Sequence, residues 1–508
     1  MSVKRLIFFL LLFHIPYENR ATGYYNYDEN SRLAYINFMS LHFDEGNNYL
    51  AAEKKTDPNN LFADYVADYA DCLPLLMNCD AAEYKLRASH FDDRIKILEK
   101  GDDKSPWYRF CIAGVYLHKA IINIRFGEQY RAAINFRRSF TLLEDNERLF
   151  PGFEYNHVFT GLQLAVVGSL PGSYKWIASV FGLKGNVKQG TAQLTTFVNN
   201  HTNAQPIYAE TALYYAFTRF YLLSEQKETW AFLNSPAFST QTNLLNTFAK
   251  VNIAIDYRKA DAALETLQAT ASDPGYNQYP IFDYQHGCAL LTRLDTMCTN
   301  FFYSYQQKTK SDLYVKDTWQ KMAFAWYANG NTAKANYCMG QVTARGDARL
   351  DADKQALRFA KNKTWPLKSV LQARLLIDGG YSDKAIAILK NITPTDIKLP
   401  ADKAEYFFRL GRGYQAAYDD NGGKENFHAA LNNYNNAIAT GKGRLEQYAA
   451  RAALQSGKML EQIGLNKEAL NKYNECLDMP THDFQNSIDQ QAKAGINRVE
   501  TSSPPFRN

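Results

Sequence analysis

The chain has 508 residues, of which 46% are hydrophobic and 21% are charged, a balance that is typical of a folded globular protein and excludes a disordered chain. Its 57 basic and 52 acidic side chains are interspersed and leave a net charge of only +5. Nucleic-acid-binding proteins usually gather Lys and Arg in a patch or stripe, and the sequence shows no such run, so it argues against a nucleic-acid partner.

The N-terminus carries the three-part pattern of a secretory signal peptide. Lys4 and Arg5 precede an apolar run at 6–15, and Ala21 and Gly23 are small residues spaced for a signal peptidase. The run is too short to cross a bilayer, although it would also suit a buried N-terminal helix. No Cys follows it, which excludes a bacterial lipid anchor at that position. We therefore expect a signal peptide at 1–23 and an exported protein, periplasmic or associated with the cell envelope, with a cytoplasmic protein as the alternative.

The seven cysteines leave the compartment open. Their number is odd, they are scattered, and no two form a Cys-x-x-Cys pair. Most of them suit small apolar positions between helices. This usage favours a reducing compartment and therefore opposes the signal-peptide interpretation.

Helical periodicity is nearly continuous after the signal segment, whereas strand signals are scarce. In the stretch 404–418, for example, Phe407, Leu410 and Tyr414 recur at steps of three and four residues, which places them on one face of a helix. Glycines and an Asp-Pro-Gly turn interrupt these helices at short intervals.

Several windows match the packing template of a tetratricopeptide helix pair. In that template a small residue on the first helix meets another small residue twelve positions later on the second helix, and Gly marks the turn. Residues 319–342 fit it at every key position, with Ala323 and Ala335 as the small pair and Gly330 at the turn. Further windows are Ala453–Cys476, Ala373–Ile392, Phe407–Ala437 with a polar insertion at 419–423, and Tyr116–Ser139, where Lys119 and Asn123 replace apolar residues.

These windows predict an all-α fold, an α-solenoid of degenerate tetratricopeptide-like helical hairpins. After residue 319 they lie about 38 to 50 residues apart, which is more than the usual repeat of about 34 and indicates longer linkers. Since one hairpin cannot bury its apolar face alone, the hairpins must stack. We expect an N-terminal helical region at 24–200 and helical repeats at 201–508 that continue from it.

The segment from Phe159 to Val198 contains an apolar run at 158–170, a Leu170-Pro171 break and a Gly-rich turn with Gly185 and Gly190. Here the chain resembles the tetratricopeptide-repeat protein 39 family, whose fungal members are called inclusion-body clearance proteins. Further similarities are Phe181-Gly182, the stretch Tyr279–Leu294 with Phe282, Cys288 and Leu291, and the stretch Tyr448–Val499. The resemblance implies a helical repeat scaffold that engages proteins and lipid-associated surfaces, and it carries over no catalytic residue.

Motifs of catalysis are absent from the sequence. There is no Walker-type phosphate loop, no His-Glu-x-x-His and no Cys/His cluster with metal-ligand spacing. His286 and Cys288 lie two positions apart and so point to different sides of a helix. Asp351 and Asp353 suit the start of a helix, where acidic groups favour the dipole. The sequence therefore predicts a protein that is not an enzyme and has no cofactor or metal.

The leading functional prediction is a scaffold for protein–protein interaction in the cell envelope, because stacked hairpins form an extended concave surface. Its partner would be a protein or peptide, with peripheral membrane association as a further possibility. The partner-binding residues would lie on the first helix of each pair, at positions the packing template leaves free: Gln320, Phe324, Arg409, Arg412 and Gln415. Two alternatives stay open: an outer-membrane glycan-binding protein of the nutrient-uptake type, and an α/α-toroid hydrolase.

Overall fold

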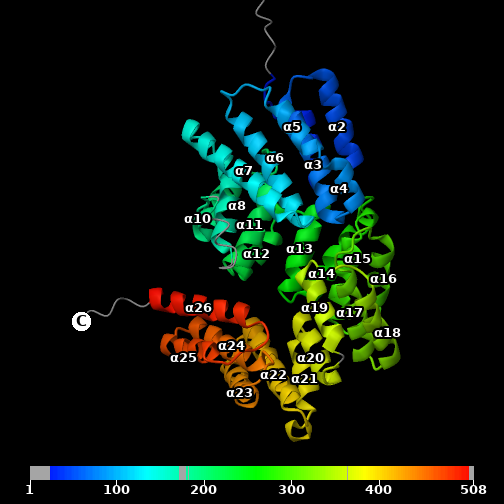
Figure 1. Ribbon diagram of the computed structural model, residues 1–508, viewed down its shortest axis with the longest axis vertical. Coiled ribbons are helices and arrows are strands. Elements are labelled where there is room, and N and C mark those ends of the chain that lie inside the picture. Colours follow the sequence, from blue (N-terminus) through cyan, green and yellow to red (C-terminus); the bar gives the residue numbers. More distant parts are fainter. Residues whose placement is uncertain (1–22, 171–178, 181, 363, 503–508) are drawn as a thin grey trace, which may run out of the picture. The chain divides into compact units, whose positions relative to one another are not determined.

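The computed structural model of the chain is a succession of helices (Figure 1). It describes residues 23–170, 179–180, 182–362 and 364–502. Within these ranges β structure is limited to two isolated bridges, so the prediction of an all-α helical repeat fold is confirmed. The apolar part of the expected signal peptide lies outside the described residues, as do Pro171, Phe181 and the stretch 174–177 between them.

The chain divides into two compact units, Met1–Asn246 and Thr247–Asn508. The boundary expected at residue 200 coincides with the end of a helix inside the first unit. In unit 1 the helices are α1 (Glu29–Met39), α2 (Phe43–Thr56), α3 (Leu61–Asn78), α4 (Ala81–Arg87), α5 (His90–Leu98), α6 (Pro106–Arg125), α7 (Gln129–Leu149), α8 (Asn156–Ser169), α10 (Val187–Asn200), α11 (Tyr208–Phe217), the π-helical turn η3 (Thr218–Leu222), α12 (Gln226–Leu233) and the short turn η4 (Pro236–Phe238).

Helix α13 (Leu244–Asp256) spans the division between the units. The helices that follow it in unit 2 are α14 (Ala260–Thr270), η5 (Tyr276–Gln278), α15 (Ile281–Leu291), α16 (Cys298–Lys308), α17 (Val315–Ala328), α18 (Thr332–Ala344), α19 (Asp351–Asn362), α20 (Lys368–Gly379), α21 (Ser382–Lys390), η6 (Pro394–Asp396), α22 (Pro400–Asn421), α23 (Lys424–Gly441), α24 (Tyr448–Gln462), α25 (Asn466–Leu477) and α26 (Gln485–Ser502).

Each predicted window forms a helical hairpin. The pairs are α6 with α7, α17 with α18, α20 with α21, α22 with α23, and α24 with α25, and the two helices of each pair pack against each other. Gly127, Gly330, Gly380 and Gly464 close four of these hairpins with φ angles of +81°, +84°, +90° and +77°. Residues with a Cβ atom rarely adopt this backbone conformation, which explains why Gly marks these turns.

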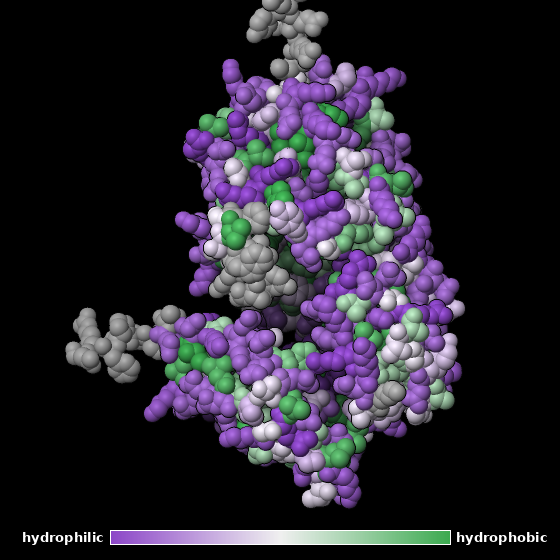
Figure 2. Space-filling view, in the orientation of Figure 1, coloured by the Kyte–Doolittle hydropathy of each residue, from purple (hydrophilic) through white to green (hydrophobic). Residues whose placement is uncertain are grey.

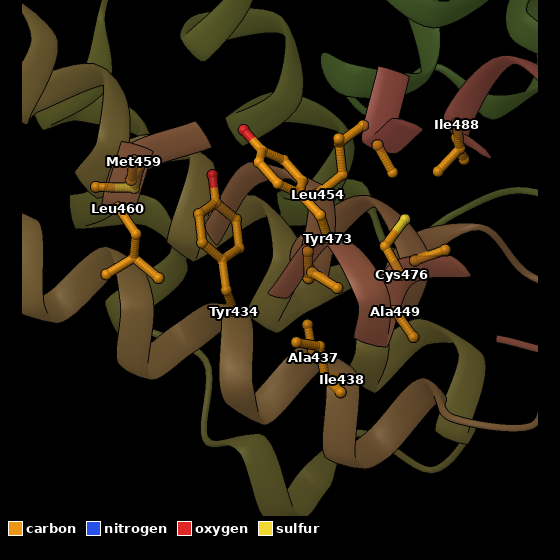
Figure 3. Packing of buried hydrophobic residues seen from close by; sticks show 14 of the residues in the cluster. Tyr434, Ala437, Ile438, Ala449, Leu454, Met459, Leu460, Tyr473, Cys476 and Ile488 are labelled. Carbon is orange, nitrogen blue, oxygen red and sulfur yellow. The ribbon is translucent and has the colours of Figure 1, made fainter. Parts of the chain in front are cut away.

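The small residues of the template lie where the two helices of a hairpin pack. Ala323 of α17 and Ala335 of α18 are both fully buried. In the last hairpin the closest neighbour of the small residue is an aromatic ring: a Cβ atom on Gly457 would lie 2.6 Å from the ring of Tyr473. Helix α26 also approaches this ring, since a Cβ atom on Gly495 would lie 2.4 Å from it. Figure 3 shows Tyr473 within this core cluster, together with Tyr434 of α23.

The hairpin of α6 and α7 forms although its crossing is polar. The side chain of Asn135 donates to Oδ1 of Asn123, twelve positions earlier, over 2.8 Å. Asn123 in turn donates to Tyr84 and Glu128, so the buried amide is satisfied. Lys119 forms an ion pair with Asp92 of α5. A hydrogen-bonded pair therefore replaces the apolar contact that the template requires.

The apolar stretch 158–170 forms α8 and belongs to the core of unit 1. Val158, Phe159 and Ala165 are fully buried. Glycines bring α8 and α10 into close contact, since a Cβ atom on Gly190 would lie 2.3 Å from the backbone oxygen of Gly161. The glycines of this segment therefore serve helix packing.

None of the helices in the described ranges combines the length and the apolar character that a membrane span requires. Hydrophilic residues cover most of the face shown in Figure 2, and hydrophobic residues form scattered groups between them.

Candidate functional site

Packing leaves only a narrow stripe of α24 at the surface. Between residues 451 and 462, the side chains that are not buried are Arg451, Gln455, Lys458, Glu461 and Gln462. They recur every three or four positions, so they share one face of the helix. The first helix of this hairpin therefore presents a row of polar and charged groups, of which Glu461 and Lys458 also bond to Arg498 and Gln491 of α26.

The same register recurs in the two preceding hairpins. The residue directly after the small residue of each first helix is a cation, at Ala373–Arg374 in α20, Gly411–Arg412 in α22 and Gly457–Lys458 in α24. All three cations are half-exposed. Two further arginines lie on the same helices, Arg409 on α22 and Arg451 on α24. We call these five residues the cationic row and the surface that carries them the first-helix face.

Acidic neighbours compensate the cationic row unevenly. Glu405 lies one turn before Arg409 and accepts two hydrogen bonds from its guanidinium at 2.9 and 3.1 Å. Arg374 lies 3.9 Å from Asp378, at the limit of an ion pair. The residue one turn before Arg451 is Gln447, whose side chain carries no charge. α24 therefore lacks the acid–base pair that α22 has.

Three members of the cationic row have no carboxylate within ion-pair distance among the described residues: Arg412, Arg451 and Lys458. Arg412 donates to the amide oxygen of Gln415 at 3.0 Å, and Lys458 donates to that of Gln491 at 2.8 Å. Arg451 lies against the ring of Phe484, and its Nε atom is buried without a hydrogen-bond partner.

The cations of the row are close enough to disfavour one another's charge. Burial, followed by the charges of Arg409 and Arg374, lowers the pKa of Arg451 to about 10. Burial, followed by Arg412 and then Arg498 of α26, lowers the pKa of Lys458 to about 8. Like charges that remain together in a folded protein are costly unless a ligand of opposite charge uses them.

The predicted site residues have different environments. Gln320 is half-buried. Phe324 has the same register position as Arg412, but it is only 5% exposed and packs edge-on against Phe359. Gln415 is also 5% exposed and accepts a hydrogen bond from Tyr434. Arg412 is half-exposed within the cationic row, so it remains a candidate for contact with a partner. The binding role of these residues stays a prediction.

The sequence interpretation did not name Arg374, Arg451 or Lys458. Arg374 and Lys458 had a usable signal, because they occupy the register position of Phe324 and Arg412 in neighbouring hairpins. For Arg451 the sequence gives a weaker indication: Gln447 stands four residues before it, whereas the acidic Glu405 stands four residues before Arg409.

Unit 1 contains a buried ionic network around His118. The side chain of His118 is 2% exposed and lies between Asp68 of α3 and Glu210 of α11, at 2.6 and 2.9 Å. Burial opposes a charge on the imidazole, but Glu210 and Asp68 raise the pKa of His118 to about 10, so both ring nitrogens donate at neutral pH. Glu210 also accepts from Tyr69 at 2.6 Å. The network joins three helices in a site closed to solvent.

Beside this network lies a pocket of about 450 Å³, which arginines and aspartates line in balanced numbers. Arg94 donates to Asp68 and Asp71 at 2.8 and 2.7 Å, so its charge is already paired. Arg87 donates to the backbone oxygen of Ala70 at 3.1 Å. That oxygen has no helical partner because the residue four positions later is Pro74, which lacks an N–H. The arginines therefore serve the fold of α3.

Asp353 has a role that its position at the start of α19 does not suggest. Its buried carboxylate accepts hydrogen bonds from the backbone N–H of Tyr314 at 2.8 Å and of Asp317 at 3.1 Å. It therefore caps the N-terminus of α17, not that of its own helix. Burial raises the pKa of Asp353 to about 6, although the two N–H donors act in the opposite direction.

No group of three or more His, Cys, Asp or Glu side chains in the described part of the chain has a geometry for a metal ion. His286 stacks on Phe301 at 3.9 Å, and Cys288 is buried, so they form no nucleophile–base pair in the structure.

Comparison with known proteins gives weak likenesses. No family model matches the chain, and no curated protein matches it. Among solved structures, yeast Tom70 shares 14% identity over 92% of this chain and 96% of its own, with a TM-score of 0.28. The tetratricopeptide domain of P58(IPK) shares 11% identity over 82% of this chain and 94% of its own, with a TM-score of 0.21. The Naa15/Naa10 complex bound to HypK-THB shares 12% identity over 93% of this chain and 78% of its own, also with a TM-score of 0.21.

Scores this low support neither a function nor a detailed superposition, so both the fold and the site rest on the geometry of the chain itself. The resemblance to the tetratricopeptide-repeat protein 39 family stays a prediction.

Proposed function

We propose that this protein is a non-catalytic helical-repeat scaffold that binds a protein partner on the first-helix face of unit 2. The observation that carries the proposal is the recurrence of a half-exposed cation at one register position in three successive hairpins. The glycines before Arg412 and Lys458 make the close contact with the second helix, since a Cβ atom on Gly411 or Gly457 would lie 2.6 Å from the ring of Tyr434 or Tyr473. A face that repeats along stacked hairpins suits an extended partner.

Site-specific photocrosslinking tests this function. A photoreactive amino acid at Gln320 or Gln455 lies on first helices, whereas Tyr337 of α18 and Glu468 of α25 are exposed positions on second helices and serve as controls. We expect the first-helix positions to crosslink one partner protein in the native cell and the controls not to. Equal crosslinking from all four positions would contradict a partner site on this face.

We also propose that the protein is exported and acts in the cell envelope. The support is the basic residues, apolar run and small residues of the first 23 positions. N-terminal sequencing of the protein purified from its native cell tests this, with Tyr24 as the expected first residue. A chain that retains the apolar run, recovered from the cytoplasm, would favour the alternative location.

A further inference from the structure

The uncompensated part of the cationic row lies on two adjacent first helices. Arg412 comes from α22, and Arg451 and Lys458 come from α24. Arg412 and Lys458 donate to neutral amides, and Arg451 lies against the ring of Phe484, so none of the three forms an ion pair with a carboxylate of the described residues. By contrast, Arg409 is paired with Glu405. Acidic groups that would pair with these cations are therefore missing at one place along the first-helix face.

We propose that this place binds carboxylates of an acidic peptide segment in the partner protein, with Arg412, Arg451 and Lys458 as the contacting residues. This inference rests on the proposed function and names the chemistry of the partner. Arginine matches a carboxylate with two parallel N–H groups, and such charge-assisted bonds are among the strongest that proteins form.

Spacing and surrounding charge favour a peptide over a nucleic acid. Arg451 and Lys458 are seven residues apart on one helix face, which corresponds to roughly 10 Å along the axis. Acidic residues at every third position of a polyproline-II segment are separated by about 9 Å on one side of that segment. Acidic Glu405 and Asp378 flank the row, and they would repel the continuous phosphates of a nucleic acid while leaving room for separated carboxylates.

Lys458 adds a pH dependence to this binding. The charged groups that act on it are Arg412 of α22, Arg451 and Glu461 of α24, and Arg498 of α26. Because the cations outweigh the single acid, free Lys458 loses its proton as the pH rises through about 8. A bound carboxylate stabilises the protonated form, so the affinity falls in the same pH range.

The test is fluorescence polarisation with the full chain and a labelled peptide of repeated Glu-Pro-Ala. The same peptide with Gln in place of Glu reports on the carboxylates, and a labelled oligodeoxythymidine reports on nucleic acid. We expect Arg451→Gln and Lys458→Gln each to weaken binding of the Glu peptide about tenfold. Lys472→Gln on α25 is the matched control and is expected to bind as the unchanged protein does, because Lys472 is paired with Glu475.

A second variant isolates the pH effect. Between about pH 7 and about pH 9 the unchanged protein is expected to lose about tenfold in affinity, whereas Lys458→Arg keeps its charge and its affinity. The thermal unfolding midpoints of all variants are measured in parallel, so that a loss of binding is not mistaken for a loss of folding.

Several outcomes would overturn the inference. These are equal binding of the Glu and Gln peptides, no loss in Arg451→Gln and Lys458→Gln, or tighter binding of the oligodeoxythymidine than of the Glu peptide. If the Glu peptide fails while crosslinking from Gln455 still captures a partner, the carboxylate chemistry is wrong and the scaffold function stands. If both fail, the function falls with it.

Discussion

Arg409 and Arg412 lie three residues apart on α22, but their surroundings give them different energetic roles. Arg409 is 16% exposed and paired with Glu405, which is 12% exposed. Burial opposes the charge of Arg409, while Glu405 raises its pKa above the ordinary value. Arg412 is half-exposed and has a neutral partner.

Charge reversal is therefore expected to separate the two arginines. Arg409→Glu places a second carboxylate one turn after Glu405 in a half-buried site and should cost about 2 kcal/mol of unfolding free energy. Arg412→Glu breaks no ion pair and should cost less than about 0.5 kcal/mol. Urea unfolding followed by circular dichroism measures both. Equal losses would mean that the Glu405 pair contributes nothing to stability.

Asp353 gives a pH dependence to unit 2. Its pKa of about 6 in the folded protein lies above the ordinary value of 3.8, so folding favours the protonated form. Its contribution to stability is therefore full below pH 3.8 and is lost as the pH rises through about 6.

Comparison with Asp353→Asn tests this dependence, since Asn does not titrate; its single oxygen accepts from only one of the two N–H groups, and that loss is the same at every pH. Relative to Asp353→Asn, the unchanged protein should lose roughly 3 kcal/mol of unfolding free energy between about pH 4 and about pH 7. Urea unfolding at several pH values measures the difference. A difference that does not change with pH would show that Asp353 titrates normally in the folded state.

At the scale of the element, the packing of the hairpin of α24 and α25 requires Gly, a residue without a side chain, at position 457. Gly457→Ala puts a methyl group 2.6 Å from the ring of Tyr473, and this fully buried ring has little room to move because the backbone of Gly495 in α26 also packs closely against it. We expect a loss of about 2 kcal/mol through overpacking. Gly340→Ala in α18 meets nothing within 4 Å and is expected to gain about 0.5 kcal/mol. The thermal unfolding midpoints of both variants measure these effects. A Gly457→Ala variant more stable than the unchanged protein would contradict the close packing of Gly457 against Tyr473.

The hairpins could be predicted from sequence because their signals are local. Helical spacing of apolar residues, a small residue and a Gly turn all lie within one window, as in 319–342. The way Asp353 caps α17 could not be predicted, since the donors at Tyr314 and Asp317 are more than thirty residues earlier. The network of His118 depends on Glu210, which is ninety-two positions away.

The site was predictable in part for the same reason. Arg412 follows from the packing template alone, and applying its register to the adjacent hairpins gives Arg374 and Lys458. The clustering of these cations is invisible along the chain, because each comes from a different hairpin. Stacking of the hairpins therefore brings together cations that are far apart in the sequence, which explains why the cationic row forms although the sequence has no basic run.

At the scale of the molecule, His118 of unit 1 and Lys458 of unit 2 give the two units opposite responses to alkaline pH. In unit 1 the pKa of His118 is raised from 6.5 to about 10, so its stabilisation is full below pH 6.5 and is lost as the pH rises through about 10. In unit 2 the pKa of Lys458 is lowered from 10.5 to about 8. Its charge opposes folding, so unit 2 is relieved of this cost as the pH rises above 8.

Mild alkali should therefore loosen unit 1 before unit 2. Between about pH 7 and about pH 10 we expect unit 1 to lose up to roughly 4 kcal/mol of opening free energy, because neutral His118 no longer holds Asp68 and Glu210 together. Hydrogen exchange with mass spectrometry, corrected for the intrinsic pH dependence of exchange, compares α6 and α11 with α22 and α24.

The control for this effect is His118→Gln, which cannot carry the charge. It should be less stable than the unchanged protein at neutral pH, and the protection of α6 and α11 should no longer fall as the pH is raised. If His118→Gln keeps the alkaline loss of protection, the titrating group in unit 1 is another residue. If α22 and α24 lose protection as early as α6 and α11, the two units do not respond separately to alkali.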